Sequence, residues 1–366
     1  MAPQAELHER RGAVGQLMGV GLSHYPPLSG RDEDMAGILR WTLEDPSIPP
    51  TTRDPSSWPA RMRDEWGDDG ALRSAAAHRA QLLDAFDRVR QAIDAFQPDA
   101  LLIWGDDQYE NFREDVIPPF CVHLYDDLDV FPWRQVAESG MMKGKPNMWG
   151  EDSNMSVHVR GARDMGRCVV DGLLQRDIDV AYAYRPLHHA GLPHAFLNTV
   201  LYLDHRRTGF DYPVLPFSVN CYGRRVVSCK GYLTRIANAI ELDPPSPSPA
   251  RMMRVGAAVA ETLSESPWRV VLIASSSWSH AFLCDKTWRL RPDTLSDQRL
   301  YSAMTEGDFE TWRKTTLEDL EDAGQQEMLN WFALLGAIER TDSTLVWSTL
   351  IETDVFNSNK AFAIFQ

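Results

Sequence analysis

Short apolar runs of the kind that form buried strands alternate along the chain with segments of helical periodicity. Strands that alternate with helices are typical of βαβ units, in which the strands join one largely parallel sheet. We therefore predict an α/β fold with a mixed, largely parallel central sheet flanked by helices. The predicted strands are Gln16–Leu22, Ala100–Trp104, Val180–Tyr184, Tyr212–Val219, Arg269–Ala274 and Ser343–Leu350.

The clearest predicted helix precedes the second strand. Its apolar side chains recur at steps of three and four residues from Leu82 to Phe96, which is the spacing of one helix face, and the pattern stops before Pro98. No internal repeat is visible, so we treat residues 1–366 as a single α/β domain. The other predicted helices are Ala162–Leu174, Pro193–Asp204, Met252–Leu263 and Gly324–Glu339.

Two irregular stretches interrupt this alternation. Asp45–Ala60 is rich in proline, and Tyr125–Ser156 mixes proline, glycine and methionine with Trp133 and Trp149. Loops of this length are usually functional lids or disordered segments, and aromatic residues argue against disorder. We expect two ordered flaps over or beside a site, with a subunit interface as the alternative.

Composition and charge restrict the class of ligand. The chain has 366 residues, of which 43% are hydrophobic and 24% charged, which is ordinary for a globular protein. A formal charge of −15 argues against a nucleic-acid partner, because Lys and Arg drive binding to phosphates. A small-molecule ligand is expected instead.

The sequence also bears on the cellular compartment. The first residues lack the apolar core of a signal peptide, and no run approaches the roughly 18 apolar residues that a membrane span needs. Five cysteines without a CxxC pair are typical of reduced cytosolic thiols, so neither a structural disulfide nor a zinc knuckle is expected. We predict a soluble, cytoplasmic protein with no membrane partner.

Polar groups follow four of the apolar runs directly. Ser23-His24 comes after the first run, Gly105–Gln108 after the second, His188-His189 after the third, and Ser275–His280 after the fifth. In open α/β sheets, ligands bind beyond the carboxyl ends of the strands. We therefore expect these groups to converge on one catalytic site.

Glu327 belongs to this set for another reason. Within the predicted helix Gly324–Glu339 it lies on the same face as Trp331, Leu334 and Ile338, so its carboxylate is expected to be buried. A buried carboxylate is normally protonated, paired or bound to a metal. The alternatives are a helix turned so that Glu327 is exposed, or an arginine partner.

The histidines have ordinary explanations as well. His24 could be a loop histidine bonded to backbone, and the start of a helix gives His194 a cap or surface role by default. His188 and His189 cannot point the same way on an extended segment, so at most one should face the site.

His280 follows a serine-rich turn, which suggests a serine hydrolase only weakly. No G-x-S-x-G motif accompanies it, and serines in a turn more often satisfy backbone groups. The glycine-rich phosphate loops are absent too, which leaves nucleotide chemistry without support.

Taken in order, the motifs resemble the class III extradiol ring-cleavage dioxygenases, and among these the LigB-type catalytic subunits of the protocatechuate 4,5-dioxygenase and gallate dioxygenase group. The resemblance runs from about Gln16 to the end of the chain. The motifs that carry it are Ser23–Pro27, Pro98–Gln108, Ile117–Phe120, His188–Pro193, Leu215–Asn220, Ser275–His280 and Glu327–Trp331.

This resemblance implies a non-haem Fe(II) enzyme that inserts both atoms of O₂ into a catechol-type aromatic ring. His24 matches the first iron-binding histidine and Glu327 the carboxylate ligand. His280 matches the acid/base histidine, and either His188 or His189 matches a second active-site histidine. Such an enzyme belongs to aromatic compound catabolism and is often a homo-oligomer, for which a dimer is our default expectation.

The chain departs from the family at Gln108, where the second iron-binding histidine would lie. A glutamine amide oxygen is a neutral but weaker donor, and neighbouring Asp107 is an anionic one that would tolerate Mn(II). Another histidine could complete the site instead, or the metal could be lost. The alternative functions are therefore another metal-dependent enzyme, such as a hydrolase or lyase, and a non-catalytic relative.

The expected chemistry follows from the groups in this set. Binding to a cation lowers the pKa of a catechol, so His280 can accept its proton and return it later. His188 or His189 would steady oxygen or a substrate hydroxyl, and the flaps would exclude water. The particular aromatic substrate is left open.

Overall fold

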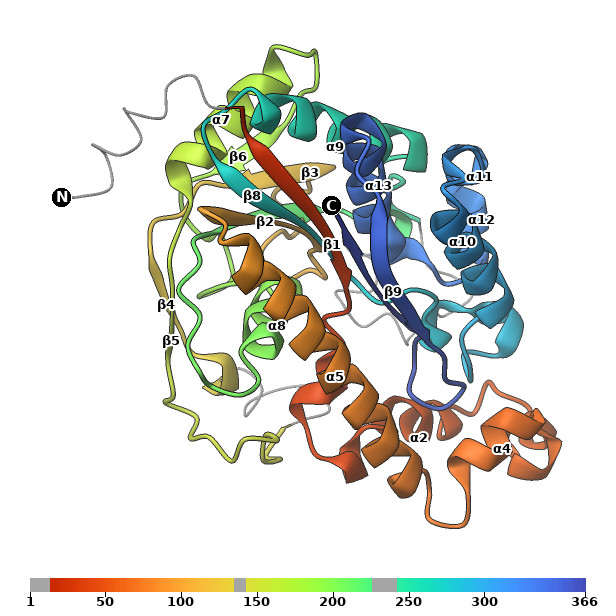
Figure 1. Ribbon diagram of the computed structural model, residues 1–366. Coiled ribbons are helices and arrows are strands. Elements are labelled where there is room, and N and C mark those ends of the chain that lie inside the picture. The colour runs from red at the N-terminus through yellow and green to blue at the C-terminus, as the bar shows by residue number, and fades with distance from the viewer. Residues whose placement is uncertain (1–13, 135–142, 226–241) are drawn as a thin grey trace.

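The predicted α/β fold is confirmed by a computed structural model, which describes residues 14–134, 143–225 and 242–366. An eight-stranded sheet runs through the molecule with helices on both faces (Figure 1). Its strand order is β6-β3-β7-β2-β8-β1-β10-β9. The strands are β1 (Gln16–Leu22), β2 (Ala100–Asp106), β3 (Phe120–His123), β6 (Ala181–Ala183), β7 (Val214–Val219), β8 (Arg269–Ser275), β9 (Leu345–Ile351) and β10 (Lys360–Phe365).

The centre of this sheet is parallel. Strands β7, β2, β8 and β1 pair in parallel, and full register joins Gln16–Leu22 of β1 to Arg269–Ser275 of β8. Strand β3 pairs antiparallel with β7 and parallel with β6, while β10 is antiparallel to both β1 and β9. The parallel strands β1, β2 and β8 therefore end at one common edge of the sheet.

Alternating side chains of the strands build two cores, because successive residues point to opposite faces. Leu102 and Trp104 of β2 join one buried cluster, whereas Leu101 and Ile103 join the other. Helices α7, α9 and α13 cover the first face, and α5 and α8 cover the second (Figure 1). The helices are α2 (Gly37–Leu43), α3 (Pro50–Arg53), α4 (Ala60–Trp66), α5 (Leu72–Phe96), α7 (Arg163–Leu174), α8 (His194–Leu203), α9 (Pro249–Ser264), α10 (Thr294–Glu306), α11 (Phe309–Lys314), α12 (Leu317–Asp322) and α13 (Leu329–Thr341).

The predicted strand Gln16–Leu22 matches β1 residue for residue. Strand β2 is two residues longer than predicted and ends at Asp106, which places that carboxylate at the edge of the sheet. The predicted helix Gly324–Glu339 is divided, because a short 3-10 turn (η7, Gln326–Met328) precedes α13. Strand β10 and helices α10 to α12 were not predicted.

The described parts of the two irregular stretches contain short regular elements and buried or packed aromatic rings. Asp45–Ala60 contains α3 and a short 3-10 turn, η3 (Pro55–Ser57), and buries Trp58. In Tyr125–Ser156, the rings of Trp133 and Trp149 pack with their centroids 5.5 Å apart. That stretch also contains β4 (Leu128–Val130), which pairs with β5 (Val157–Val159), while its residues 135–142 lie outside the described part.

A helix able to cross a membrane would have to be long and strongly apolar, and none of those in residues 14–134, 143–225 and 242–366 qualifies. The four cysteines in these ranges, at positions 121, 168, 221 and 284, are free thiols.

Candidate metal and acid–base site

Side chains from separate elements meet at the carboxyl edge of the parallel strands. His24 lies two residues beyond β1, and Asp106 is the last residue of β2. Glu327 comes from η7, and His194 is the first residue of α8. His280 follows the turn after β8 and forms an isolated bridge with Ser358. The topology therefore brings together residues that are far apart in the sequence.

His24 lies at the centre of this group and is almost fully buried. Its Nδ1 donates to the carbonyl oxygen of Ser275 over 3.0 Å and lies 3.1 Å from the hydroxyl of the same residue. Its Nε2 therefore faces the carboxylates, 3.6 Å from Asp106 Oδ1 and 3.8 Å from Glu327 Oε2.

Both carboxylates are buried and only partly satisfied. Neither oxygen of Asp106 has a hydrogen-bond partner, and Glu327 Oε2 has none either. The other oxygen of Glu327 accepts a short hydrogen bond from the Tyr222 hydroxyl and lies 3.3 Å from His280 Nε2. Unpartnered buried carboxylate oxygens are costly in a folded protein unless something else binds them.

A second histidine completes the group. The ring of His194 meets the ring of His24 edge to face, with 4.8 Å between the centroids. One ligand atom from each of His24, Asp106 and His194 lies within 4.8 Å of the others. His194 Nδ1 is bonded to Glu110 Oε1 over 2.5 Å, and its backbone N–H donates to Glu110 Oε2 over 2.9 Å.

Burial and mutual repulsion control the protonation of these groups. Burial, followed by the charge of Asp106, raises the pKa of Glu327 well above its usual value, and burial likewise raises the pKa of Asp106. Burial lowers the pKa of His24 and takes that of His280 to about 3. For His194 burial acts in the same direction, but nearby carboxylates, led by Glu110, outweigh it and raise its pKa to about 10.

These observations match what a divalent cation requires. Neutral imidazole nitrogens and carboxylate oxygens are ligands that suit Fe(II) and Mn(II). A bound cation would also offset the mutual repulsion of the two carboxylates, and it would take the place of the proton that they favour on His194. The residues present therefore fit a bound metal.

The structure places the other predicted site residues around this centre. The Asp107 carboxylate accepts hydrogen bonds from the backbone N–H groups of residues 110–112, so it caps the turn after β2. His188 is bonded to Asp115 over 2.9 Å, whereas His189 Nε2 lies 3.8 Å from Glu110. The two neighbouring histidines thus point to different partners, and His189 is the one beside the Glu110–His194 pair. Gln108 lies in the same turn and is partly buried.

The serine-rich turn supports structure. Ser275 donates to the carbonyl of Ala195, and Ser279 donates to that of Ala323 over 2.5 Å. Ser275 is also completely buried on β8, so its hydroxyl, although close to His24, is not accessible to a substrate.

Sequence reasoning missed Glu110 and Tyr222, did not single out Asp106 within the Gly105–Gln108 segment that it expected at the site, and gave His194 no place there. A longer β2 would have placed Asp106 at the sheet edge, and Glu110 lies two residues beyond that segment. His194 was assigned a cap or surface role, which the structure corrects: the residue does begin α8, but its ring lies against His24. Nothing in the sequence distinguishes Tyr222.

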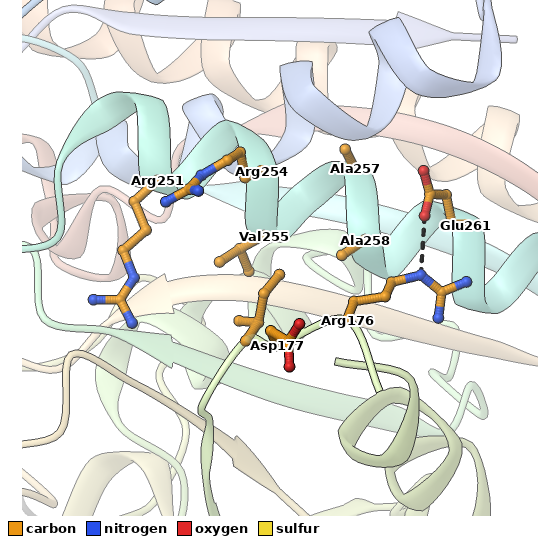
Figure 2. A pocket seen from close by; sticks show the side chains of 9 residues that line it. Arg176, Asp177, Arg251, Arg254, Val255, Ala257, Ala258 and Glu261 are labelled. Carbon is orange, nitrogen blue, oxygen red and sulfur yellow. Dashed lines mark hydrogen bonds and ion pairs between the residues drawn. The ribbon is translucent and has the colours of Figure 1, made fainter. Parts of the chain in front are cut away.

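A separate groove lies against α9 and the turn after α7 (Figure 2). It has a volume of about 470 Å³ and is lined by three arginines, two acidic residues and four apolar residues. Arg176 is bonded to Glu261 over 2.9 Å. None of the lining residues is a histidine or cysteine, so this groove offers no metal ligands comparable to those at the sheet edge.

Residues 237–363 match the family described as the catalytic LigB subunit of aromatic ring-opening dioxygenase. A 2,3-dihydroxyphenylpropionate/2,3-dihydroxicinnamic acid 1,2-dioxygenase of Paraburkholderia phymatum is 26% identical over 192 residues, which are 52% of this chain and 46% of that protein. A second enzyme of that name, from Pseudomonas putida, gives the same identity and coverage. The chain thus spans about half the length of the curated relatives it matches.

A solved structure of an uncharacterized protein from Escherichia coli K12 is 12% identical to the chain. It covers 77% of this chain and 91% of its own, with a TM-score of 0.44.

Proposed function

Because the chain is related to the LigB-type class III extradiol dioxygenases, as its ordered motifs predict, we propose that it is a metal-dependent dioxygenase. Its substrate would be an aromatic ring with two adjacent hydroxyls, opened beside those hydroxyls with O₂ as the oxidant. One observation supports this proposal above the others: His24 Nε2 lies 3.6 Å and 3.8 Å from two buried carboxylate oxygens, Asp106 Oδ1 and Glu327 Oε2, that have no hydrogen-bond partner.

Fe(II) is the cation proposed for this point, and Mn(II) is the alternative. When bound, the metal would lower the pKa of the substrate hydroxyls and provide the contact between substrate and O₂. The chain's own residues have other tasks. His24 is fixed by Ser275 so that Nε2 faces the cation site, and Tyr222 holds one oxygen of Glu327.

His280 is proposed as the acid/base group. Its Nε2 lies 3.3 Å from Glu327, so it is next to any substrate held there, and its Nδ1 has no partner. Burial favours the neutral imidazole, which is the form that can accept a proton from a substrate hydroxyl. Once charged, it can return that proton to the ring-opened product.

The test is oxygen uptake by protein loaded anaerobically with Fe(II) and then exposed to a panel of catechols. The expected result is one O₂ consumed per ring opened, with loss of uptake in Glu327→Gln. Glu318→Gln on the exposed face of α12 is the matched control and should keep full activity. Metal-loaded protein that consumes no O₂ with any catechol would overturn the proposal.

The main alternative is a hydrolase or lyase that uses the cation to polarise a carbonyl or water. Two carboxylates in the site favour a hard cation and make this reading reasonable. The same experiment separates the two, because such an enzyme would form product without consuming O₂.

A further inference from the structure

We propose that His194 supplies the second imidazole ligand that Gln108 cannot provide, so that the cation is held by His24, His194 and Asp106, with Glu327, 3.8 Å from His24, as a fourth donor. This inference rests on the proposed metal site but not on the reaction performed there. It assigns a metal-binding role to the first residue of α8, which is hydrogen-bonded to Glu110 of the turn that carries Gln108.

The distances allow one cation to reach these donors. At bond lengths of about 2.1 Å, two ligand atoms on the same ion lie at most roughly 4.2 Å apart. His24 Nε2 is already 3.6 Å from Asp106 and 3.8 Å from Glu327. The ligand atoms of His24, Asp106 and His194 span 4.8 Å at most, so a shift of under about 1 Å would bring them into one coordination sphere.

The hydrogen bonds of His194 also fit a ligand. Its Nδ1 is occupied by Glu110 Oε1, which leaves Nε2 as the nitrogen able to bind a cation. Metal-bound histidines commonly donate their other ring N–H to a carboxylate, which fixes the ring and raises its basicity. Glu110 holds the same residue twice, because its second oxygen accepts the backbone N–H of His194.

His24 is prepared in the same way. The carbonyl of Ser275 accepts from its Nδ1 and leaves Nε2 directed at the carboxylates. In both imidazoles Nδ1 is thus engaged in a hydrogen bond, and Nε2 is the nitrogen left for a cation. A surface or capping histidine would need neither this pairing nor the edge-to-face contact with His24.

The turn after β2 explains why the proposed metal site does not need Gln108 as a ligand. Asp107 of this turn accepts hydrogen bonds from backbone N–H groups, and Glu110 of the same turn is hydrogen-bonded to His194. The turn therefore supports a histidine from α8 where the resembling family uses a histidine of its own. The site keeps two imidazoles and gains a second carboxylate.

Co(II) titration of the full-length, metal-free protein tests this assignment, with affinity and visible absorption as readouts. We expect His194→Ala to weaken Co(II) binding at least 100-fold and to change the absorption of the bound ion. Glu110→Gln, which removes only the supporting carboxylate, should weaken it about 10- to 100-fold. Gln108→Ala should stay within twofold of the original protein.

A double variant gives the sharpest result. Gln108→His combined with His194→Ala returns an imidazole from the turn after β2 and should recover most of the lost affinity. His158→Ala removes an exposed histidine of β5 and is the matched control, with unchanged binding expected. Thermal melts of the metal-free variants show whether each one still folds.

The outcomes distinguish this inference from the proposed reaction. Co(II) binding that depends on His194, in a protein that consumes no O₂ with Fe(II), would support the ligand set and refute the dioxygenase. Binding that survives His194→Ala but disappears in Gln108→Ala would overturn the ligand set. A folded protein that binds no divalent cation would overturn both.

Discussion

The ionisable side chains of the site are buried at an energetic cost. His24, His280, Asp106 and Glu327 are all almost fully buried, although burying an ionisable group without a matching partner is unfavourable. The neutral imidazoles tolerate burial, but the two carboxylates each keep oxygens without a hydrogen-bond partner. Such a cluster would be stabilised by a bound cation, which the proposed metal site supplies.

His280→Ala should separate metal binding from catalysis. The side chain contacts Glu327 but is not placed among the proposed ligands, so the affinity for Fe(II) should stay within a few fold. Turnover should fall about 10²- to 10⁴-fold, the usual contribution of a positioned acid/base group. Glu327→Ala should lose both properties. Metal titration and oxygen uptake on the two variants provide the check, and full turnover in His280→Ala would refute the assigned role.

His123 should make the fold sensitive to acid. It is buried on β3 against Ser218, with 2.7 Å between Nε2 and Oγ, and burial lowers its pKa from 6.5 to about 3. Between pH 6.5 and pH 3, His123 is protonated in the unfolded chain but neutral in the folded chain. Stability is therefore lost as the pH falls below about 6.5. At pH 5 this group should cost about 2 kcal/mol relative to pH 8.

The comparison variant is His123→Gln, which keeps a polar contact with Ser218 but does not titrate. Urea unfolding at pH 8 and pH 5 should show a smaller loss of stability in this variant, by about 2 kcal/mol. Equal pH dependence in both proteins would contradict the assignment.

Among the elements, α10 links the segments that carry the acid/base and carboxylate groups. The carboxylate of Asp297 accepts from the backbone N–H of Ser279 at 3.1 Å, from Gln325 at 2.6 Å and from Asn359 at 2.8 Å. These partners lie next to His280, just before Glu327, and in the turn before β10. One buried side chain thus fixes the relative positions of three site segments.

Asp297→Asn should therefore shift the site segments, although Asp297 is not itself a residue of the site. The new amide presents a donor where the carboxylate accepted several hydrogen bonds, and leaving such buried donors unpaired costs about 1–3 kcal/mol. We expect lower thermal stability together with reduced turnover. Asp84→Asn, an exposed change on α5, is the control, and unchanged stability in Asp297→Asn would show that this network is dispensable.

The elements also show what sequence could and could not predict. Strands such as β1 were predictable because continuous apolar runs between polar residues have few other solutions. The burial of Glu327 followed from its helical spacing and is observed. His194 could not be placed, since its partners Glu110 and His24 are near only after α8 packs beside the sheet. Strand β10 was missed because it depends on pairing with β1 from the opposite end of the chain.

In the whole molecule, the site lies where distant parts of one chain meet. His24 follows the first strand of the sheet, whereas Glu327 precedes α13 near the carboxyl-terminal end (Figure 1). The central sheet and both helical layers must therefore be in place before these groups come together. A cation bound there would connect the segment after β1 to the segment before α13.

Metal binding should consequently stabilise the whole fold. A ligand that binds only the folded state adds about 2.7 kcal/mol when its free concentration is 100 times the dissociation constant. Mn(II), which avoids oxidation during heating, should raise the unfolding temperature of the full-length protein, and the rise should grow with the logarithm of its free concentration relative to the dissociation constant. Calorimetry with increasing Mn(II), reversed by a chelator, measures this effect. In Glu327→Gln this rise in unfolding temperature should disappear. Because the variant also removes a buried carboxylate, its metal-free form should unfold no earlier than the metal-free original protein. A rise that persisted in the variant would place the cation elsewhere in the molecule.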